Sequence, residues 1–364
     1  MRINKLALTN FRSYPTLELT FEPGVVTFIG DNGSGKTNIA EALIYLSFLS
    51  SHRVSNNTPL ISLGAQQGII RAEIERDDRT LTVDLEINTN KTNRAQLNGN
   101  PTRSQREILG ACQIVYFSPE DLDLVRGEPG DRRNFLDRLL ITRSPRLAGV
   151  ITDYERVVKQ RNALLKTRAS QNALVPWNEQ FIALAAQLTA ERIALIDALN
   201  PWVGKNYANL NEVKHASISY KCNTEGVGID VEKNITALNA KLEEVMYQEI
   251  ERGVSLIGPH RDDLHLQLGD FPAKGYASHG ESWSMAISLR IGSFNLLKSE
   301  SFEPILILDD VFAELDTSRR QALLSVTSIA EQTIITAAVE SDLPTELLTQ
   351  RFYVTPGNVR KGAS

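Results

Sequence analysis

One eight-residue stretch near the N-terminus constrains the fold more than any other part of this 364-residue chain. It has the glycine, lysine and threonine spacing of a phosphate-binding loop. It reads Gly30, Asp31, Asn32, Gly33, Ser34, Gly35, Lys36, Thr37. The apolar residues 25–29 before it predict a buried strand, and residues 38–48 after it place apolar side chains at helical spacing without glycine or proline. The stretch therefore has the strand–loop–helix context that this motif requires.

Each residue type in the loop has a physical role in binding a polyphosphate. Glycines let the backbone bend so that several N–H groups point at one anion, and the start of the following helix adds the positive end of its dipole. Lys36 would reach the β- and γ-phosphates of a nucleotide, and the hydroxyl of Thr37 would bind Mg²⁺.

A second nucleotide signal lies at residues 304–310. Four consecutive apolar residues predict a buried parallel strand, and two carboxylates, Asp309 and Asp310, end it. This is a Walker B pattern, in which Asp309 would hold Mg²⁺ and Asp310 would stand next to the attacking water as the catalytic carboxylate. The two signals together predict an ATPase.

Two further segments of the second half fit the same superfamily. Ser278, His279, Gly280 and Glu281 precede a predicted helix at 280–298 and resemble the signature of ABC-type ATPases, whose serine and glycine reach the γ-phosphate bound to the opposite subunit. An ordinary helix N-cap is the alternative interpretation of the same four residues. Asp316, six residues beyond Asp310, resembles the D-loop aspartate of these ATPases.

Matches that span nearly the whole chain resemble the RecF family of bacterial recombination mediators. They lie at residues 10–14, 30–38, 118–122, 127–137, 159–162, 258–264 and 309–316. The resemblance implies an ATPase head like that of SMC-type proteins with a short arm, and it adds Arg12 and Asn38 to the nucleotide-binding residues. It implies ATP and Mg²⁺ as cofactors and dimerisation on ATP. It also implies binding of single-stranded and duplex DNA at gaps and junctions, and help in loading RecA together with RecO and RecR.

Two departures from the wider ABC pattern bear on the reaction. Ala337 and Ala338 stand where many members carry a switch histidine, and Asp310 stands where most carry glutamate. A shorter carboxylate without a histidine suits a weak, DNA-stimulated ATPase that acts as a switch. No glutamine marks the loop that follows residue 115, so Ser118 or Glu120 would take its place.

The order of these signals predicts an α/β fold, namely an ABC-type P-loop ATPase head with an inserted, mainly helical arm. Residues 1–117 and 301–364 would form the ATP-binding lobe, and residues 118–300 the arm and signature lobe. Within the arm, 145–169 and 174–200 read as an antiparallel helix pair that Pro201 closes. Another ABC-type ATPase, such as a transporter subunit or an SMC-like DNA-organising protein, is the alternative.

The DNA contact has to come from a local basic surface, because the net charge is −5. Residues 126–168 hold eleven lysines and arginines against five carboxylates. The candidate phosphate contacts there are Arg132, Arg133, Arg138, Lys159 and Arg161. The alternative interpretation of this basic cluster is an ordinary solvated helix face. If DNA does not bind there, the next candidate surface is the hairpin side of the ATPase lobe, near Arg71 and Lys91.

The remaining bulk features concern the compartment. The two cysteines lie far apart in sequence, which favours a reducing compartment, and the first residues lack the apolar core of a signal peptide. No apolar run approaches membrane-spanning length. We expect a cytoplasmic, nucleoid-associated protein.

Overall fold

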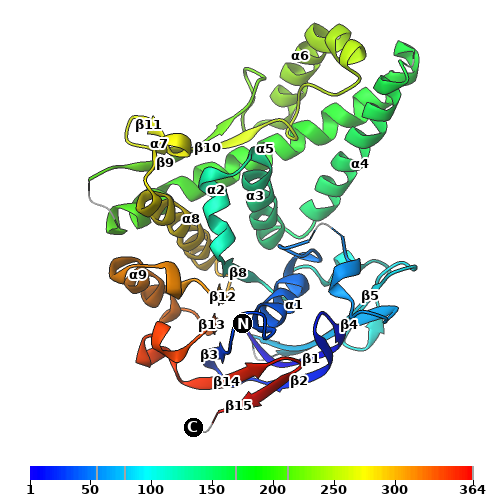
Figure 1. Cartoon of the computed structure of the whole chain (residues 1–364). Helices are drawn as coiled ribbons and strands as arrows, with labels where there is room; N and C mark the ends of the chain where they lie inside the picture. The colour runs from blue at the N-terminus through cyan, green and yellow to red at the C-terminus, as the bar shows by residue number, and fades with distance from the viewer. Residues whose placement is uncertain (55, 78, 169, 211–212, 363–364) are drawn as a thin grey trace. The chain divides into compact units, whose positions relative to one another are not determined.

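The computed structural model describes residues 1–362 except residues 55, 78, 169, 211 and 212. For residue 171 it describes the backbone but not the side chain. Its contacts divide the chain into unit 1, Met1–Asp121 with Leu289–Ser364, and unit 2, Leu122–Ser288 (Figure 1). The lobes expected from the motifs divide the chain at 117/118 and 300/301 instead. The difference arises because the second half of one long helix packs as part of unit 1.

Two six-stranded sheets build unit 1. The first runs β2-β1-β4-β5-β6-β7 and is antiparallel throughout, while the second runs β15-β14-β3-β13-β12-β8 and is parallel except at β15. The strands are β1 (Arg2–Phe11), β2 (Tyr14–Thr20), β3 (Gly24–Ile29), β4 (Gln67–Arg76), β5 (Arg79–Asn88), β6 (Arg94–Leu97), β7 (Asn100–Pro101), β8 (Ile114–Phe117), β12 (Ile305–Asp309), β13 (Gln332–Ala337), β14 (Gln350–Thr355) and β15 (Asn358–Lys361). The unit's helices are α1 (Lys36–Phe48), α9 (Thr317–Thr327) and the last part of α8 (His279–Ser299).

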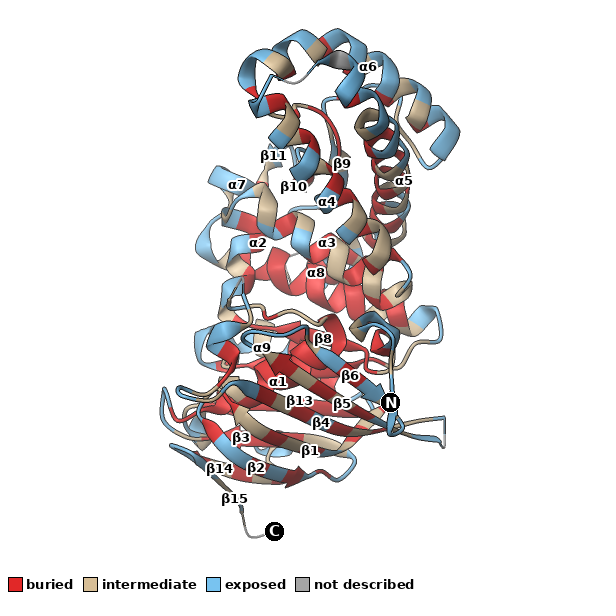
Figure 2. Cartoon of the chain, turned by 90° about the vertical axis from the view of Figure 1, so that its right-hand side faces the viewer, coloured by how far each residue is buried: buried red, intermediate tan, exposed pale blue. Residues whose placement is uncertain are grey.

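Sequence periodicity accounts for most of these elements. β4 and β5 alternate between buried and less buried side chains and pair as the predicted hairpin, whose turn includes position 78, outside the described residues. β12 is buried at every residue because it lies between β8 and β13. All of α1 except Thr37 and Asn38 is buried, and it shares one apolar core with both sheets (Figure 2). This packing holds the phosphate loop at the start of α1.

Unit 2 is mainly helical, as expected for the inserted arm. Its elements are α2 (Leu122–Arg126), α3 (Pro129–Arg143), α4 (Leu147–Lys166), α5 (Gln171–Leu210), α6 (Val231–Arg252), α7 (Ala273–Tyr276), the first part of α8, and the sheet β11-β10-β9 made of β9 (Ala216–Lys221), β10 (Asp263–Leu268) and β11 (Phe271–Pro272). Helix α4 packs against α5, as the predicted pair requires.

The predicted helix end at Pro201 is wrong, because α5 continues through this residue to Leu210. Leu199, Val203 and Tyr207 on either side of the proline are fully buried, and α5 packs against β9, α4 and α6. A proline inside a helix costs about 3 kcal/mol in intrinsic propensity. Burial of this apolar face outweighs that cost. Among the helices of the described residues, none is long and apolar enough to cross a membrane.

Candidate nucleotide site

The phosphate loop joins β3 to α1, as its sequence predicts. Gly35 occupies the N-cap of α1 with a φ of 116°, and Gly33 has a φ of 82°. Both angles lie in the left-handed region, which side chains with a Cβ rarely adopt. A Cβ at Gly35 would also lie 2.6 Å from the hydroxyl of Tyr14, and one at Gly30 would lie 2.2 Å from the carbonyl oxygen of Val354. Glycine at these positions therefore lets the loop curl between close neighbours.

Lys36 folds back across its own loop. Its side chain is 2% exposed, and Nζ donates to the carbonyl oxygens of Gly30 at 2.7 Å and Asp31 at 3.2 Å. The same Nζ lies 4.0 Å from Oδ2 of Asp310. The structure thus brings the lysine of the first nucleotide signal beside a carboxylate of the second, although 274 residues separate them in the chain.

The two carboxylates of the second signal stand at the end of β12, beside Thr336 of β13. The hydroxyl of Thr336 donates to Oδ1 of Asp309 at 2.6 Å and accepts the backbone N–H of Asp310 at 2.9 Å. Asp310 has a φ of 51°, so the chain turns sharply as soon as the strand ends. Burial raises the pKa of Asp309 to about 6. It also raises the pKa of Asp310, against the opposing effect of the Lys36 ammonium.

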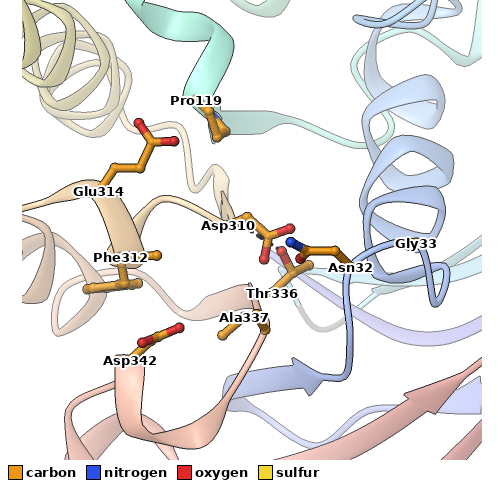
Figure 3. A pocket seen from close by; sticks show the side chains of 11 residues that line it. Asn32, Gly33, Pro119, Asp310, Phe312, Glu314, Thr336, Ala337 and Asp342 are labelled. Atoms are coloured by element: carbon orange, nitrogen blue, oxygen red, sulfur yellow. Dashed lines mark hydrogen bonds between the residues drawn. The ribbon is translucent and has the colours of Figure 1, made fainter.

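Asp310 and Thr336 border a cavity of about 350 Å³ in unit 1 (Figure 3). It is lined by Asn32, Gly33, Pro119, Asp310, Phe312, Ala313, Glu314, Thr336, Ala337, Ala338 and Asp342. None of these lining residues is a histidine, and Ala337 and Ala338 occupy the edge of the cavity that follows β13. The absence of a histidine from this lining agrees with the departure from the ABC pattern that the sequence showed.

The residues present fit a magnesium–nucleotide complex. The side-chain hydroxyl of Ser34 is buried within the loop and has no hydrogen-bond partner among the described residues, so it is available to an anion held by the loop. Mg²⁺ is commonly held by one or two carboxylates together with phosphate oxygens. Thr37, in the first turn of α1, and the buried Asp309 are side chains of the type that this ion takes.

Arg12 and Asn38 line a second cavity of unit 1, of about 570 Å³, next to the start of α1. The guanidinium of Arg12 donates to both carboxylate oxygens of Glu41 at 2.7 and 2.6 Å and to the carbonyl oxygen of Pro59 at 2.9 Å. Nδ2 of Asn38 donates to Oγ of Ser13 at 2.9 Å. Arg12 is therefore fixed to the helix that begins at the phosphate loop. The assignment of Arg12 and Asn38 to the nucleotide site stays a prediction.

The signature residues lie in unit 2 at the start of α8. The hydroxyl of Ser278 accepts the N–H of Glu281 at 3.2 Å, and the Glu281 carboxylate accepts the N–H of Ser278 at 2.8 Å, which is a capping box. Lys214 donates to Glu281 at 2.5 Å, and this bond holds the pKa of Glu281 below its ordinary value. Ser278 and His279 are exposed. These residues therefore form an N-cap for α8, and the side chains of Ser278 and His279 stay accessible to a second molecule.

In unit 1, Asp316 caps α9 by accepting the N–H of Arg319 at 3.0 Å, and it also pairs with the Arg319 guanidinium. Of the two candidates for the missing glutamine, Ser118 is buried and Glu120 is exposed. Glu120 adds its negative charge to the field that raises the pKa of Asp309. The choice between Ser118 and Glu120 stays a prediction.

Comparison with known proteins gives the family. The family model described as the RecF/RecN/SMC N terminal domain matches residues 2–349. The DNA replication and repair protein RecF of Streptomyces avermitilis is 47% identical over 372 residues, covering 99% of this chain and 100% of that protein. The protein of the same name from Frankia alni is 46% identical over 378 residues and is covered completely. The chain belongs to the RecF family.

Solved structures agree with the fold of a RecF-family chain. The recombination mediator protein RecF-ATP in the RecFOR pathway matches with a TM-score of 0.91 and 25% identity, over 99% of this chain and 97% of that one. The SMC head bound to the C-winged helix domain of ScpA matches with a TM-score of 0.59 and 16% identity, over 100% and 97%. The predicted α/β fold of an ABC-type ATPase head with an inserted helical arm is confirmed.

The arm of this RecF-family chain uses several of its arginines for packing. Arg132 is 4% exposed and binds both carboxylate oxygens of Asp263 at 2.7 and 2.9 Å. Arg161 is fully buried and pairs with the buried Glu249 at 2.5 Å. Neither guanidinium is open to a DNA phosphate, so Arg132 and Arg161 are corrected from candidate DNA contacts to packing residues.

The other three candidates differ among themselves. Arg133 is half-buried and donates to the carbonyl oxygen of Asp262 at 2.8 Å, while Asp137, four residues further along the same helix, pairs with Arg192. Burial lowers the pKa of Arg133. Arg138 is half-buried and Lys159 is exposed.

Sequence reasoning missed three residues that shape the site: Thr336, Glu41 and Tyr14. Thr336 hydrogen-bonds to the Asp309 carboxylate and to the backbone N–H of Asp310, Glu41 fixes Arg12, and Tyr14 lies against Gly35. Thr336 lies next to the end of the strand that pairs with β12, so a prediction of strand order would have placed it beside Asp309. Glu41 lies within the predicted helix 38–48 and carried no recognisable signal.

Proposed function

We propose that this chain is an ATP-dependent DNA-binding protein of replication and recombinational repair that uses slow ATP hydrolysis as a switch. The observation that carries the proposal is that Lys36 of the glycine-rich loop lies 4.0 Å from Asp310, which directly follows Asp309 at the end of β12. The family relationship supports the DNA-repair role, since the relatives are named DNA replication and repair proteins.

Different residues of the site have different roles in binding and hydrolysing ATP. The loop backbone from Gly30 to Thr37, with the ammonium of Lys36, binds and orients the phosphates of ATP. Thr37 and Asp309 hold the Mg²⁺ ion, which when bound neutralises developing negative charge on the phosphates. Asp310, which lines the cavity 4.0 Å from Lys36, would orient the attacking water.

The same residues account for a slow reaction. The Asp310 carboxylate is one methylene shorter than glutamate, and the neighbouring lining residues Ala337 and Ala338 have no group that could share a proton. These features support weak, DNA-stimulated turnover that limits the lifetime of an ATP-bound state.

The proposed output of the switch is a homodimer. Ser278, His279, Gly280 and Glu281 of one copy would cover the ATP held by the loop of the other, and Asp316 would lie at the same interface. The exposure of Ser278, His279 and Asp316 supports this role. In the cytoplasm, the ATP-bound dimer would bind DNA at gaps and junctions of single and double strands, and act with RecO and RecR in loading RecA.

The test is DNA binding as a function of nucleotide. We expect tight binding to gapped duplex with ATP or a non-hydrolysable analogue and weak binding with ADP, because only the γ-phosphate links the two copies. Lys36→Ala should abolish ATP binding and the ATP-dependent gain in DNA affinity, and thermal unfolding would show that the variant is folded. A folded Lys36→Ala protein with normal ATP affinity would contradict the assignment of the site.

A further inference from the structure

One segment of the ATPase lobe has a composition unlike the rest of this acidic chain. Residues 87–106 hold four cations and no carboxylate, whereas the whole chain has a net charge of −5. Asparagine, glutamine, serine and threonine make up most of the remaining positions, and the segment contains no aromatic residue. We propose that its cations, Lys91, Arg94, Arg103 and Arg106, form the surface that binds the phosphates of duplex DNA, and we call them the hairpin-edge cations.

The hairpin-edge cations are all exposed. None of their side chains makes a hydrogen bond or ion pair with any residue that the structure describes. Arginines closer to the middle of the same sheet differ, since Arg71 pairs with Asp84 at 2.8 Å and Arg2 with Glu75 at 2.8 Å. Four side chains that have no protein partner leave their positive charge available to an outside anion.

The segment is held in a defined shape and is not a loose tail. It forms β6 and β7, the last strands of the sheet order β2-β1-β4-β5-β6-β7, and therefore one edge of the sheet (β6 is labelled in Figure 2). Asn98 turns the chain with a φ of 51°, and its side chain accepts the N–H of Thr82 at 2.9 Å. Asn93 accepts the N–H of Asn88 at 2.8 Å. Both loops are thereby fixed to β5.

The carboxylates that flank the segment are already engaged. Glu107 accepts the N–H of Ser104 at 3.0 Å in a capping box. Glu86 accepts from Asn88 at 2.9 Å, and Asp84 is held by Arg71. The hydrogen bonds hold Glu107 and Glu86 in place without cancelling their charge, and of these three carboxylates only Asp84 is in an ion pair with a described residue. The four hairpin-edge cations outnumber Glu86 and Glu107, so the edge keeps a local excess of positive charge.

The chemistry of the edge favours a phosphate backbone over exposed bases. Arginine, lysine, asparagine and backbone N–H groups supply most protein–phosphate hydrogen bonds, which carry no sequence information. Proteins that hold single strands add aromatic side chains on which the bases stack, and residues 87–106 have none. The ligand class is therefore duplex DNA, such as the double-stranded side of a gap. This assignment rests on the proposed function and names the surface that performs it.

The test compares two variants that each remove four charges. The edge variant carries Lys91→Gln, Arg94→Gln, Arg103→Gln and Arg106→Gln. The arm variant removes the same charge from exposed cations of unit 2, with Arg156→Gln, Lys159→Gln, Lys166→Gln and Lys233→Gln. Binding of the full-length proteins to a blunt duplex is measured with ATP across a series of salt concentrations. Thermal unfolding and ATP affinity are measured for each protein.

Each lost phosphate contact lowers the salt slope by about 0.9. The edge variant should therefore lose about 3 to 4 units of slope and on the order of 10²- to 10³-fold in affinity near physiological salt. The arm variant should keep the wild-type slope. A third variant, with Arg94→Lys, Arg103→Lys and Arg106→Lys, keeps the charge and should keep the slope as well.

The possible outcomes distinguish a failure of the hairpin-edge assignment from a failure of the proposed function. If wild-type protein binds duplex with ATP and the folded edge variant binds it with an unchanged slope, the hairpin-edge assignment is overturned and the proposed function stands. If the arm variant alone loses slope, the arm carries the phosphates and the assignment is again overturned. Wild-type protein that binds ATP but no DNA would overturn the proposed function and the assignment together.

Discussion

Asp309 gives the sharpest prediction for the nucleotide-free protein, because its proposed role as a Mg²⁺ ligand requires a charge that its surroundings disfavour. The side chain is 3% exposed, and its hydrogen bond from Thr336 lies within a buried strand pair. Asp309→Asn keeps the shape and the acceptor for Thr336 and removes the buried charge. We therefore expect this variant to be more stable than the wild type when no nucleotide or Mg²⁺ is present.

The size and pH dependence of the effect follow from the pKa. Burial raises the pKa of Asp309 from 3.8 to about 6, so the folded state holds the proton more tightly than the unfolded state. A shift of this size corresponds to about 3 kcal/mol of lost stability when the group is charged. A salt-bridged carboxylate stabilises the fold when it is charged, whereas the charged form of Asp309 destabilises it. The loss of stability is complete above the pKa of Asp309 in the folded state and vanishes as the pH falls to its pKa in the unfolded state.

Chemical denaturation across a pH series measures this directly. Asp309→Asn should exceed the wild type by about 2–3 kcal/mol near pH 7.5 and match it near pH 4. Asp316→Asn is the matched control, because it changes an exposed N-cap aspartate to an equally good cap and should alter stability little. A variant at position 309 that is less stable than the wild type near neutral pH would refute the reasoning.

The remaining predictions concern catalysis and the arm. Asp310→Asn should retain ATP binding, lose turnover and give a long-lived ATP-bound dimer, and a normal rate of phosphate release would show that Asp310 is not the catalytic carboxylate. Arg161→Met should lower the free energy of unfolding by about 3–5 kcal/mol, because it leaves the fully buried Glu249 without its partner. The neighbouring Lys159→Met, at an exposed position, should change it by less than about 0.5 kcal/mol. A loss below about 1 kcal/mol in Arg161→Met, measured by denaturant titration, would contradict a packing role.

Sequence reasoning predicted the local elements of the site because their signals are local. The phosphate loop requires a strand before it and a helix after it, and β3 and α1 supply them. The fully apolar run before Asp309 indicated a strand with neighbours on both sides, and β12 has them. Residues 69–76 and 80–87 alternated clearly enough to give the β4–β5 hairpin.

Features that depend on distant partners were not predictable in this way. Pro201 ended the predicted helix because intrinsic propensity is local, whereas the burial that carries α5 to Leu210 comes from other elements. Arg132 and Arg161 counted toward a basic surface, but their carboxylate partners lie 131 and 88 residues away in sequence. Counting charges along a segment cannot distinguish an exposed cation from one inside an ion pair.

At the hairpin edge, a charge count along the sequence underestimated a surface that the structure shows to be accessible. The arm segment 126–168 has a charge excess of six, larger than the four of residues 87–106, so charge counting favoured the arm. In the structure, the four cations of residues 87–106 are exposed and their side chains have no partner among the described residues. Several arginines of residues 126–168 instead form ion pairs and hydrogen bonds that join helices and strands of unit 2. Accessible charge, rather than total charge, decides which surface can bind a phosphate backbone.

The central claim is that ATP joins two copies, each of which supplies the part of the site that the other lacks. Mixing Lys36→Ala with Ser278→Arg protein tests this claim most directly, because neither variant alone can build an intact site. Random pairing makes half of the dimers mixed, and each mixed dimer has one intact site of two. We therefore expect ATP turnover to return to about a quarter of the wild-type value in a symmetric dimer. A mixture no more active than the sum of its two separate components would contradict the account.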